Sequence, residues 1–256
     1  MAREQRLVFG EVADAYQQHR PTYPDGVFDA IVELAGLAPG DPVLDVGAGT
    51  GKATESLVAR AFDVTAIEPS PEMARVLQSR LPAVTVHVSG FEDAVLEVHH
   101  YAVITAAQSW HWVDPARGPR KAHEVLRPRG WLALFWNGSA LDDCEWHDEL
   151  QPIYKRIAPE MAHDTLHHAQ DSSVRVRLHE LSDSGLFDEP VVCHVPWVTR
   201  YSTDQYIALL GTHSNHRLLP DEQRAALHTA IAESIGARGG EIEHPYTTDL
   251  VAARVK

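Results

Sequence analysis

Residues 42–54, PVLDVGAGTGKAT, decide the fold of this chain. The run from Val43 to Val46 contains two β-branched residues and lacks a helical period, which predicts a short buried strand. Three glycines at alternate positions then break the strand, and residues 52–60 continue as a helix. Alternate glycines let the backbone turn sharply and approach a ligand closely, because no Cβ stands in the way. Since free N–H groups at a helix N-terminus favour an acceptor or an anion, the stretch predicts a cradle for a small molecule.

Strand-sized and helix-sized segments alternate along the first half of the chain. Apolar segments typical of strands occupy residues 43–46, 63–67, 84–88, 101–106 and 131–136. Helical patterns occupy residues 8–18, 26–37, 52–60, 71–80 and 115–126. This alternation predicts an α/β fold, in which right-handed crossovers join parallel strands and helices cover both faces of the sheet.

The second half contains more helix than one crossover requires. Helical patterns and strands follow in the order helix 142–166, helix 175–184, strand 191–199, helix 203–210, helix 221–235 and strand 245–255. We interpret the excess helix as a cap over the carboxyl edge of the sheet. We therefore predict one domain, 1–256, with lid helices in 1–40, a cofactor-binding core in 41–137, the cap and sixth strand within 138–240, and the last strand in 241–256.

Composition and charge narrow the possible partners. The formal net charge is −14, from 36 acidic and 22 basic residues, which argues against a nucleic-acid partner. The locally basic stretch 117–129 is interrupted by Glu124 and is typical of a solvated helix face. Cys144 and Cys193 lie far apart and form no motif, which fits a reducing compartment. No signal-peptide core and no apolar run of spanning length occur, so we expect a cytoplasmic protein without a membrane partner.

Three ligands compete for a glycine-rich turn between a strand and a helix. A nucleoside triphosphate requires G-x-x-x-x-G-K-[ST], but Ala53 occupies the Ser/Thr position and Val46 the first glycine position. A dinucleotide requires G-x-G-x-x-G, whereas this chain has G-x-G-x-G with the acidic Asp45 just ahead of it. An acid is a poor neighbour for a pyrophosphate. The pattern favours a ligand that has an amino group and no phosphate.

The segment 43–51, VLDVGAGTG, closely resembles the first motif of class I S-adenosylmethionine-dependent methyltransferases. Glu68 stands where an acid takes both ribose hydroxyls in that family, and two acceptor oxygens match two vicinal donors. Met73 resembles the residue that packs on the adenine, although a methionine at this spacing is equally typical of core. The segment 89–92, SGFE, resembles the adenine loop but has glycine where many relatives have aspartate. The segment 124–132, EVLRPRGWL, resembles the LxPGG turn, with Arg129 in place of the first glycine.

The flanking segments resemble the small-molecule methyltransferases, including the trans-aconitate methyltransferase group. Residues 9–16 and 20–24 look like the N-terminal lid helix of these enzymes, and 108–112, QSWHW, looks like their Q-x-x-H-W segment. The resemblance implies a Rossmann-like fold with seven strands, mostly parallel, of which the last is antiparallel. It implies that the cofactor is S-adenosyl-L-methionine, with S-adenosyl-L-homocysteine as product. The implied cofactor-binding residues are Tyr16, Asp45, Gly47, Gly49, Gly51, Glu68, Pro69, Met73, Phe91, Glu92 and Gln108.

The sulfonium methyl group is already activated, so the protein must mainly align the reactants and exclude water. A carboxylate acceptor is already nucleophilic, whereas a hydroxyl, an amine or an enol carbon needs a base. His111, just beyond the fourth strand, is the best-placed candidate for a catalytic base, a substrate contact or a packed structural residue. Trp110 and Trp112 are candidates for the wall of an apolar substrate pocket or for core. Arg20 is a candidate for binding the carboxylate of an acidic substrate, for closing over the methionine end of the cofactor, or for an exposed helix-end cation.

The acceptor itself stays open. The chain has 16 histidines, and His163 and His167 have helical i, i+4 spacing, but no companion carboxylate or cysteine completes a site, so we expect no metal. His213 and His216 are candidates to face the pocket from the cap. We predict a small-molecule acceptor and a monomer or homodimer; the rivals are a nucleic-acid or protein methyltransferase and a non-catalytic cofactor-binding protein. A cavity with arginines would indicate carboxylates, and an apolar one terpenoid, polyketide or aromatic acceptors.

Overall fold

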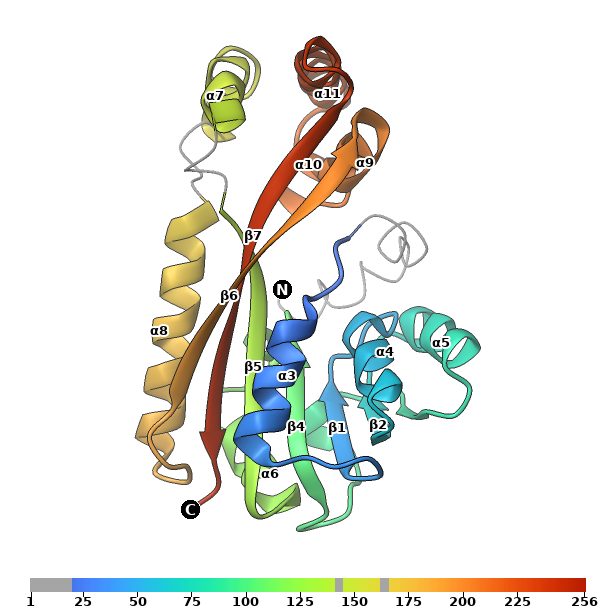
Figure 1. Cartoon of the computed structure of the whole chain (residues 1–256), viewed down its shortest axis with the longest axis vertical. Helices are drawn as coiled ribbons and strands as arrows, with labels where there is room; N and C mark the ends of the chain where they lie inside the picture. The colour runs from blue at the N-terminus through green and yellow to red at the C-terminus, as the bar shows by residue number, and fades with distance from the viewer. Residues whose placement is uncertain (1–19, 141–144, 162–165) are drawn as a thin grey trace.

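The computed structural model describes residues 20–140, 145–161 and 166–256. The predicted lid helix 8–18, and with it Tyr16, lies outside these residues. Within them, one seven-stranded sheet runs through the molecule in the order β3-β2-β1-β4-β5-β7-β6 (Figure 1). Its strands are β1 Pro42–Val46, β2 Asp63–Ile67, β3 Thr85–His87, β4 Tyr101–Ala107, β5 Leu126–Ser139, β6 Val191–Ser202 and β7 Glu241–Arg254.

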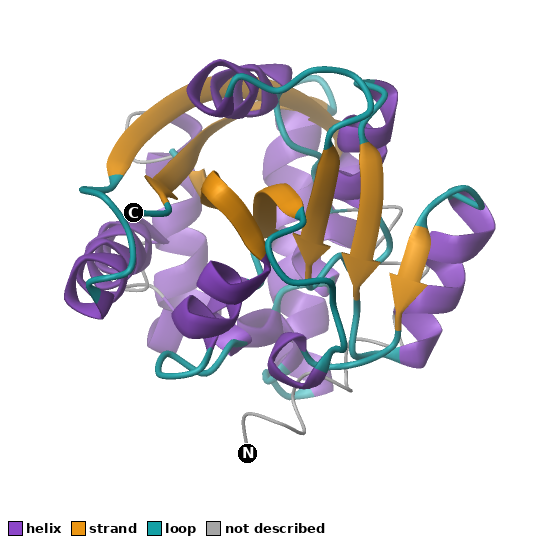
Figure 2. Ribbon diagram, turned by 90° about the horizontal axis from the view of Figure 1, so that it is seen from below, coloured by secondary structure: helices purple, strands orange, loops and turns teal. Residues whose placement is uncertain are grey.

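The direction of the strands confirms the predicted fold class. Strand β1 pairs in parallel with β2 and β4, β2 with β3, and β4 with β5. Strand β7 inserts between β5 and β6 and is antiparallel to both. Buried residues lie on both faces of β2, β1, β4 and β5, as is typical of parallel strands between helical layers. Figure 2 shows the twist of this sheet and the helices that flank it.

Two helical layers cover the sheet. The helices are α3 Asp25–Ala35, α4 Lys52–Ala59, α5 Pro71–Arg80, α6 Gly118–Val125, α7 Glu145–Ile157, α8 Leu166–Ser184, α9 Thr203–Gly211, α10 Ser214–Arg217 and α11 Asp221–Ala237. In the described segments, short 3-10 turns lie at η2 Phe91–Asp93, η3 Trp110–Trp112 and η5 Pro159–Met161. One hydrophobic core joins α3, α4 and α5 to the sheet, and a second joins α6 and α8 to its other face.

The end of the sheet near the cap differs from the prediction. Strands β5, β6 and β7 are longer than predicted and continue beyond the core to carry the cap helices (Figure 1). The prediction placed the cap within 138–240 and found its excess helix between the fifth and sixth strands. In the structure, α7 comes from that connection, whereas α9, α10 and α11 come from the connection between β6 and β7. A third core that includes Trp146, Tyr206 and Ile231 unites α7, α9 and α11 into one cap.

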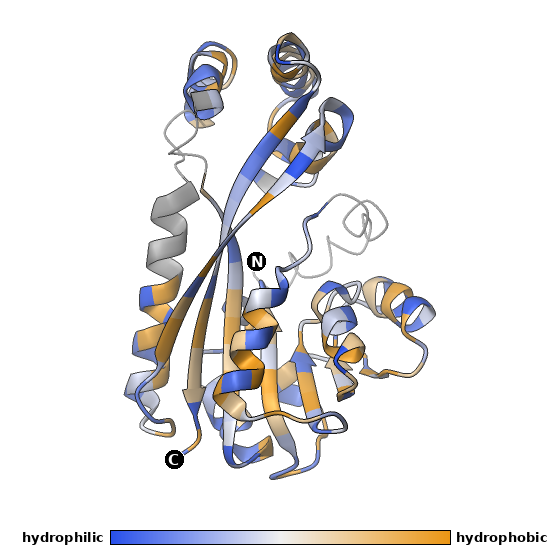
Figure 3. Ribbon diagram, in the orientation of Figure 1, coloured by the Kyte–Doolittle hydropathy of each residue, from blue (hydrophilic) through white to orange (hydrophobic). Residues whose placement is uncertain are grey.

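The reason for the longer strands lies in their alternation. In the extension, residues of β7 from Glu241 to Tyr246 alternate between exposed or half-buried and buried positions. One face of the extension packs on the cap core while the other meets solvent, which keeps the strand stable with polar residues in it. Figure 3 shows this change, because the strands are mainly hydrophobic in the core and more hydrophilic toward the cap.

Candidate functional site

The glycine turn after β1 has the geometry of a ligand cradle. Gly47 and Gly49 have φ values of +68° and +59°, in the left-handed region that favours glycine. The N–H groups of Gly47 and Ala48 both donate to the carbonyl of Ile67, at 2.8 and 3.0 Å, which fixes the turn to the end of β2. A Cβ on Gly47 would lie 2.4 Å from that of Ser109, whereas a Cβ on Gly49 would meet only the sulfur of Met73, at 4.0 Å. Gly47 is thus required by packing, and Gly49 leaves room for a ligand.

Gly51 has a different function from the one predicted. It begins α4 with a φ of +90°, and a Cβ there would lie 3.1 Å from Leu77 of α5. Gly51 does not line the cavity. The third glycine of the motif therefore serves the packing of α4 against α5 and not the ligand, which corrects the prediction.

Glu68, at the end of β2, is a carboxylate held in place by backbone groups. Its side chain accepts hydrogen bonds from the N–H of Gly49 and from the N–H of Ser70, each at 2.8 Å. The residue is only 5% exposed, and burial raises the pKa of its carboxyl group above the usual value. Two carboxylate oxygens offer about four acceptor positions, so two remain for a ligand after the backbone bonds. Glu68 and Pro69 both line the cavity, as predicted from the sequence.

The carboxylate of Asp45 makes hydrogen bonds within the fold. Its two oxygens accept hydrogen bonds from the hydroxyls of Thr54 and Thr105, at 2.7 and 3.0 Å. The residue is fully buried, and this burial raises the pKa of its carboxyl group to about 6. Asp45 borders the cavity. Its carboxylate ties β1 to α4 and β4 and so supports the cradle from below.

A single cavity of about 520 Å³ connects the cradle with the cap. We call its two parts the cofactor half and the cap half. The cofactor half is lined by residues of the core up to Val113, among them the predicted Asp45, Gly47, Gly49, Glu68, Pro69, Met73, Phe91, Glu92, Gln108, His111 and Trp112, and by Arg20 at its edge. The cap half is lined by residues 136–139 of β5 and by side chains from α7, α9, α10 and β7.

The residues predicted to hold an adenine are partly used by the protein. Phe91 is buried and its ring lies 5.8 Å from that of Trp110, and Met73 is also buried. Glu92 accepts a hydrogen bond from the N–H of Asp114 at 2.7 Å. These contacts fix the loop after β3 at the border of the cavity, and direct contact with a cofactor stays a prediction.

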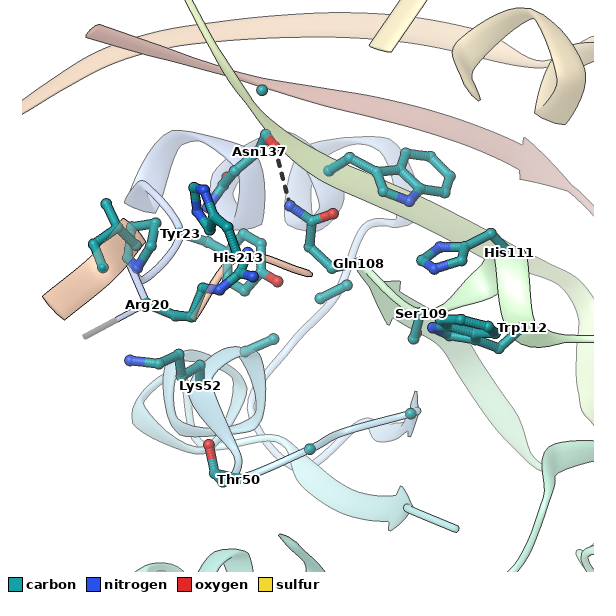
Figure 4. Close-up of a pocket in the computed structure, with 18 of the residues that line it drawn as sticks. Arg20, Tyr23, Thr50, Lys52, Gln108, Ser109, His111, Trp112, Asn137 and His213 are labelled. Carbon is teal, nitrogen blue, oxygen red and sulfur yellow. Dashed lines mark hydrogen bonds between the residues drawn. The ribbon is translucent and has the colours of Figure 1, made fainter. Parts of the chain in front are cut away.

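The segment after β4 divides between the cavity and the core. Gln108 has a φ of +57°, unusual for a residue other than glycine, and its Nε2 donates to the carbonyl of Asn137 at 3.0 Å. Backbone strain of this kind is often concentrated at functional sites. Figure 4 shows His111 and Trp112 on one side of the cavity, Arg20 and His213 on the other, and Gln108 between them.

Trp110 lies in the core, which is one of the two environments predicted for it, and does not line the cavity. It is fully buried in the core on the α6 and α8 face, and its Nε1 donates to Glu180 at 2.9 Å. Trp112 and the exposed His111 line the cavity. The turn η3 points successive side chains in different directions, so adjacent residues of the motif reach different environments.

Arg20 connects the segment before α3 to the cap. Its Nε donates to the hydroxyl of Thr212 at 2.9 Å, and its Nη2 donates to the carbonyl of Thr212 at 3.0 Å. Asn137 of β5 donates to the carbonyl of Thr22 at 2.9 Å. This bond holds residues 20–24, which we call the strap, against β5. Arg20 therefore lies at the border between the cap and the cofactor half of the cavity.

The cap half contains imidazole and phenol rings that the sequence did not disclose, apart from the candidates His213 and His216. Burial lowers the pKa of His213, that of His216 to about 4 and that of His244 to about 3, so all three are neutral at neutral pH. His244 contacts the hydroxyl of Ser139 at 3.0 Å and stacks on Tyr246. The residues that sequence reasoning missed are Lys52, Tyr23, Trp136, Asn137, Ser139, His147, Tyr154, Tyr206, His244 and Tyr246.

Two absences concern the described part of the chain only. Across residues 20–140, 145–161 and 166–256, no three His, Cys, Asp or Glu side chains gather closely enough to hold a metal ion. The predicted histidine pair begins at His163, which is outside that part. Among the helices that the structure describes, none combines the length and apolar character that crossing a bilayer requires.

Comparisons with known proteins agree with this geometry. A family profile described as methyltransferase domain matches residues 44–134. An uncharacterized methyltransferase of Mycobacterium tuberculosis is 42% identical over 135 residues, which are 53% of this chain and 54% of that protein. An uncharacterized methyltransferase-like protein of Schizosaccharomyces pombe is 27% identical over 227 residues, 87% of this chain and 83% of that protein. The bacterial match thus spans about half of that relative's length.

Solved structures support the fold. The structure of a putative type II methyltransferase from Anaeromyxobacter dehalogenans superposes with a TM-score of 0.65 at 24% identity, over 92% of this chain and 97% of that one. Residues 44–134 thus match a methyltransferase domain, and the chain as a whole has the fold of this solved structure. The chain's closer similarity to the trans-aconitate methyltransferase group stays a prediction.

Proposed function

We propose that this protein transfers a methyl group from S-adenosyl-L-methionine to a small-molecule acceptor. The observation that supports the proposal most directly is the single cavity that joins the glycine cradle and Glu68 to the cap half. The cradle fits the cofactor because a Cβ on Gly49 would enter open space, and because Glu68 keeps acceptor positions for two donors. When bound, the cofactor supplies an activated methyl group.

The chain's own residues would divide the work of binding. Glu68 would accept hydrogen bonds from both ribose hydroxyls, and the backbone of Gly47 and Gly49 would lie against the ligand. Met73 and Phe91 would pack near the adenine. Arg20, which donates to Thr212, would close the cavity beside the methionine part of the cofactor. The cap would exclude water and orient the acceptor, because positioning and desolvation supply most of what this reaction needs.

Shape and charge support a small-molecule acceptor. A net charge of −14 disfavours a polyanionic substrate. The cap half of the cavity is bounded by the cap helices and by the strap, which Arg20 joins to Thr212. A site of this kind suits a compact molecule that enters the cavity as a whole.

Isothermal titration calorimetry with three ligands tests the proposal. S-adenosyl-L-homocysteine is expected to bind one site per chain, and NAD and ATP are expected not to bind, because the carboxylates of Asp45 and Glu68 are poor neighbours for a pyrophosphate or a triphosphate. Binding of NAD or ATP with no binding of S-adenosyl-L-homocysteine would overturn the assignment.

A further inference from the structure

The cap half of the cavity presents rings and no carboxylate. Among the described residues that line it, the charged acidic groups are absent, whereas Asp45, Glu68 and Glu92 all lie in the cofactor half. Its walls are formed mainly by Trp136, Tyr154, Tyr206, Tyr246, His216 and His244. Aromatic walls of this kind favour a flat, uncharged ring system, through stacking and edge contacts.

A chain of three hydrogen-bonding groups leads out of this half of the cavity. The hydroxyl of Tyr154 on α7 lies 3.2 Å from Nε2 of His216 on α10. Nδ1 of His216 lies 3.1 Å from Nε2 of His228 on α11. Tyr154 and His216 line the cavity, while His228 does not and is partly exposed. The three groups thus connect the acceptor's surroundings to the outer side of the cap.

The three groups can carry a proton in one direction. Burial raises the pKa of Tyr154, so its hydroxyl keeps its proton and donates to Nε2 of His216. The Nδ1–H of His216 then donates to Nε2 of His228, whose Nδ1–H is left for solvent. The charged and titratable neighbours are His213 beside His216 and Arg224 beside His228, and both oppose a second positive charge. A proton therefore passes through His216 and does not stay on it.

This arrangement distinguishes among acceptors. A carboxylate needs no base, so the chain of groups would have no task. An ammonium would face no carboxylate in the cap half and would lie near the cation of Arg20. An alcohol holds its proton about as tightly as water does, while the pKa of a phenol is far lower, at about 10. A relay of weakly basic imidazoles suits the phenol.

Resting on the proposed function, we propose that the acceptor is an uncharged phenol and that Tyr154, His216 and His228 relay its proton to solvent. The phenol oxygen forms a bond to the methyl carbon as the bond from that carbon to sulfur breaks, and the electron pair stays on sulfur. The phenol proton passes to Oη of Tyr154, the tyrosine proton to Nε2 of His216, the Nδ1 proton of His216 to Nε2 of His228, and a proton from His228 to solvent.

A matched pair of probes tests the acceptor class. 2-Naphthol and 2-naphthoate share a ring system and differ in a phenol against a carboxylate. With methyl-labelled S-adenosylmethionine, label is expected in the ether of 2-naphthol and not in the ester of 2-naphthoate. Label in the ester, or in neither product while S-adenosyl-L-homocysteine still binds, overturns the inference and leaves the proposed cofactor site standing. Absence of S-adenosyl-L-homocysteine binding would instead refute the proposed function.

Two variants test the relay with a readout that a structural role would not give. Tyr154→Phe and His228→Gln are expected to slow methylation of 2-naphthol about tenfold or more. The same variants should leave methylation of 4-nitrophenol within about twofold in mildly alkaline buffer, because that phenol is already ionised. His194→Gln, an exposed imidazole outside the cavity, is the control and should change neither rate. Equal losses with both phenols overturn the relay.

The tautomer of His216 gives a test that needs neither cofactor nor acceptor. In protein labelled with ¹⁵N-histidine, the relay requires a neutral His216 with the proton on Nδ1 and a free lone pair on Nε2. The nitrogen chemical shifts of the two ring atoms distinguish this tautomer from the other. A proton on Nε2 in the wild-type protein, with Nδ1 free, overturns the direction of the relay.

Discussion

The two halves of the cavity are built in different ways. The cofactor half comes from short, contiguous stretches at the ends of β1, β2, β3 and β4, and its lining includes the backbone of Gly47 and Gly49 and buried carboxylates. The cap half comes from residues between 136 and 246, spread over five elements, and its titratable groups are neutral rings. The carboxylates thus line the cofactor half, which is proposed for a cationic ligand, whereas the titratable groups of the cap half are uncharged.

The contrast shows where each half draws its precision. Strand ends and tight turns fix the cofactor half, because a glycine with positive φ or a buried acid allows few alternatives. The cap half depends on long strands and on three helices that meet only in the folded state. The first half therefore suits one ligand in a fixed position, whereas the lining of the second half can change without disturbing the core.

The largest effect is expected at Gly47 when it is compared with Gly49. Gly47→Ala places a Cβ 2.4 Å from that of Ser109 at a positive φ, and should cost about 4 kcal/mol of unfolding free energy. Gly49→Ala meets open space and should cost about 1 kcal/mol, yet lose about 100-fold in affinity for S-adenosyl-L-homocysteine. Urea unfolding and calorimetry measure the two quantities. Equal unfolding costs would show that the two glycines do not have separate functions.

The next effect concerns the buried charge of Asp45. Its folded pKa of about 6 lies above the ordinary 3.8, so the folded state binds the proton more tightly. Stability from this group is therefore present at low pH and is lost as the pH rises from about 4 to about 6, by about 3 kcal/mol in total. Asp45→Asn lacks this loss. Denaturant unfolding across this range should show the variant gaining on the wild type as the pH rises, and a constant difference would contradict the burial of the charge.

Trp110 tests the boundary between core and cavity. Trp110→Phe removes the hydrogen bond to Glu180 and some core volume, and should cost about 2 kcal/mol of unfolding free energy. Affinity for S-adenosyl-L-homocysteine should stay within about twofold. The comparison variant is Trp112→Phe, which changes a cavity wall. A tenfold loss of affinity in Trp110→Phe alone would place Trp110 in the site after all.

The smallest effect is expected for the two hydrogen bonds by which Arg20 joins the strap to Thr212 of the cap. Arg20→Ala removes two hydrogen bonds to Thr212 and should cost about 1 kcal/mol. Hydrogen exchange should increase in α9, and affinity for S-adenosyl-L-homocysteine should fall about threefold. Arg200→Ala, whose ion pair with Glu243 is exposed, is the matched control and should change neither. Unchanged hydrogen exchange in Arg20→Ala would show that these two hydrogen bonds do not hold the cap.

The same contrast explains how much of the molecule the sequence could predict. The core elements were predicted within one or two residues where glycine, proline or an acid marks their ends, as at β2 and α5. Arg129 is a finer case, because it adopts a φ of +64° and takes the conformation of the glycine it replaces in the LxPGG turn. The direction of each side chain after β4 was not predictable, since one 3-10 turn sends Trp110 into the core and leaves His111 exposed.

The cap resisted prediction for a physical reason. Its site residues carry no local signal, because Tyr154, His216 and His228 become neighbours only when α7, α10 and α11 pack. The extensions of β5 and β7 also escaped prediction, since their polar residues interrupt the apolar runs that mark strands. Sequence patterns thus predict the half built from local turns, and the half built from tertiary contacts requires the structure.

Calorimetric titration of S-adenosyl-L-homocysteine into wild-type protein and Glu68→Ala tests the central claim most directly. The control is Glu55→Ala, which removes an exposed partner of Arg80. Loss of two charge-assisted hydrogen bonds predicts that Glu68→Ala binds about 100-fold more weakly or not at all, with Glu55→Ala unchanged. Wild-type affinity in a folded Glu68→Ala protein would contradict the assignment of the cofactor half.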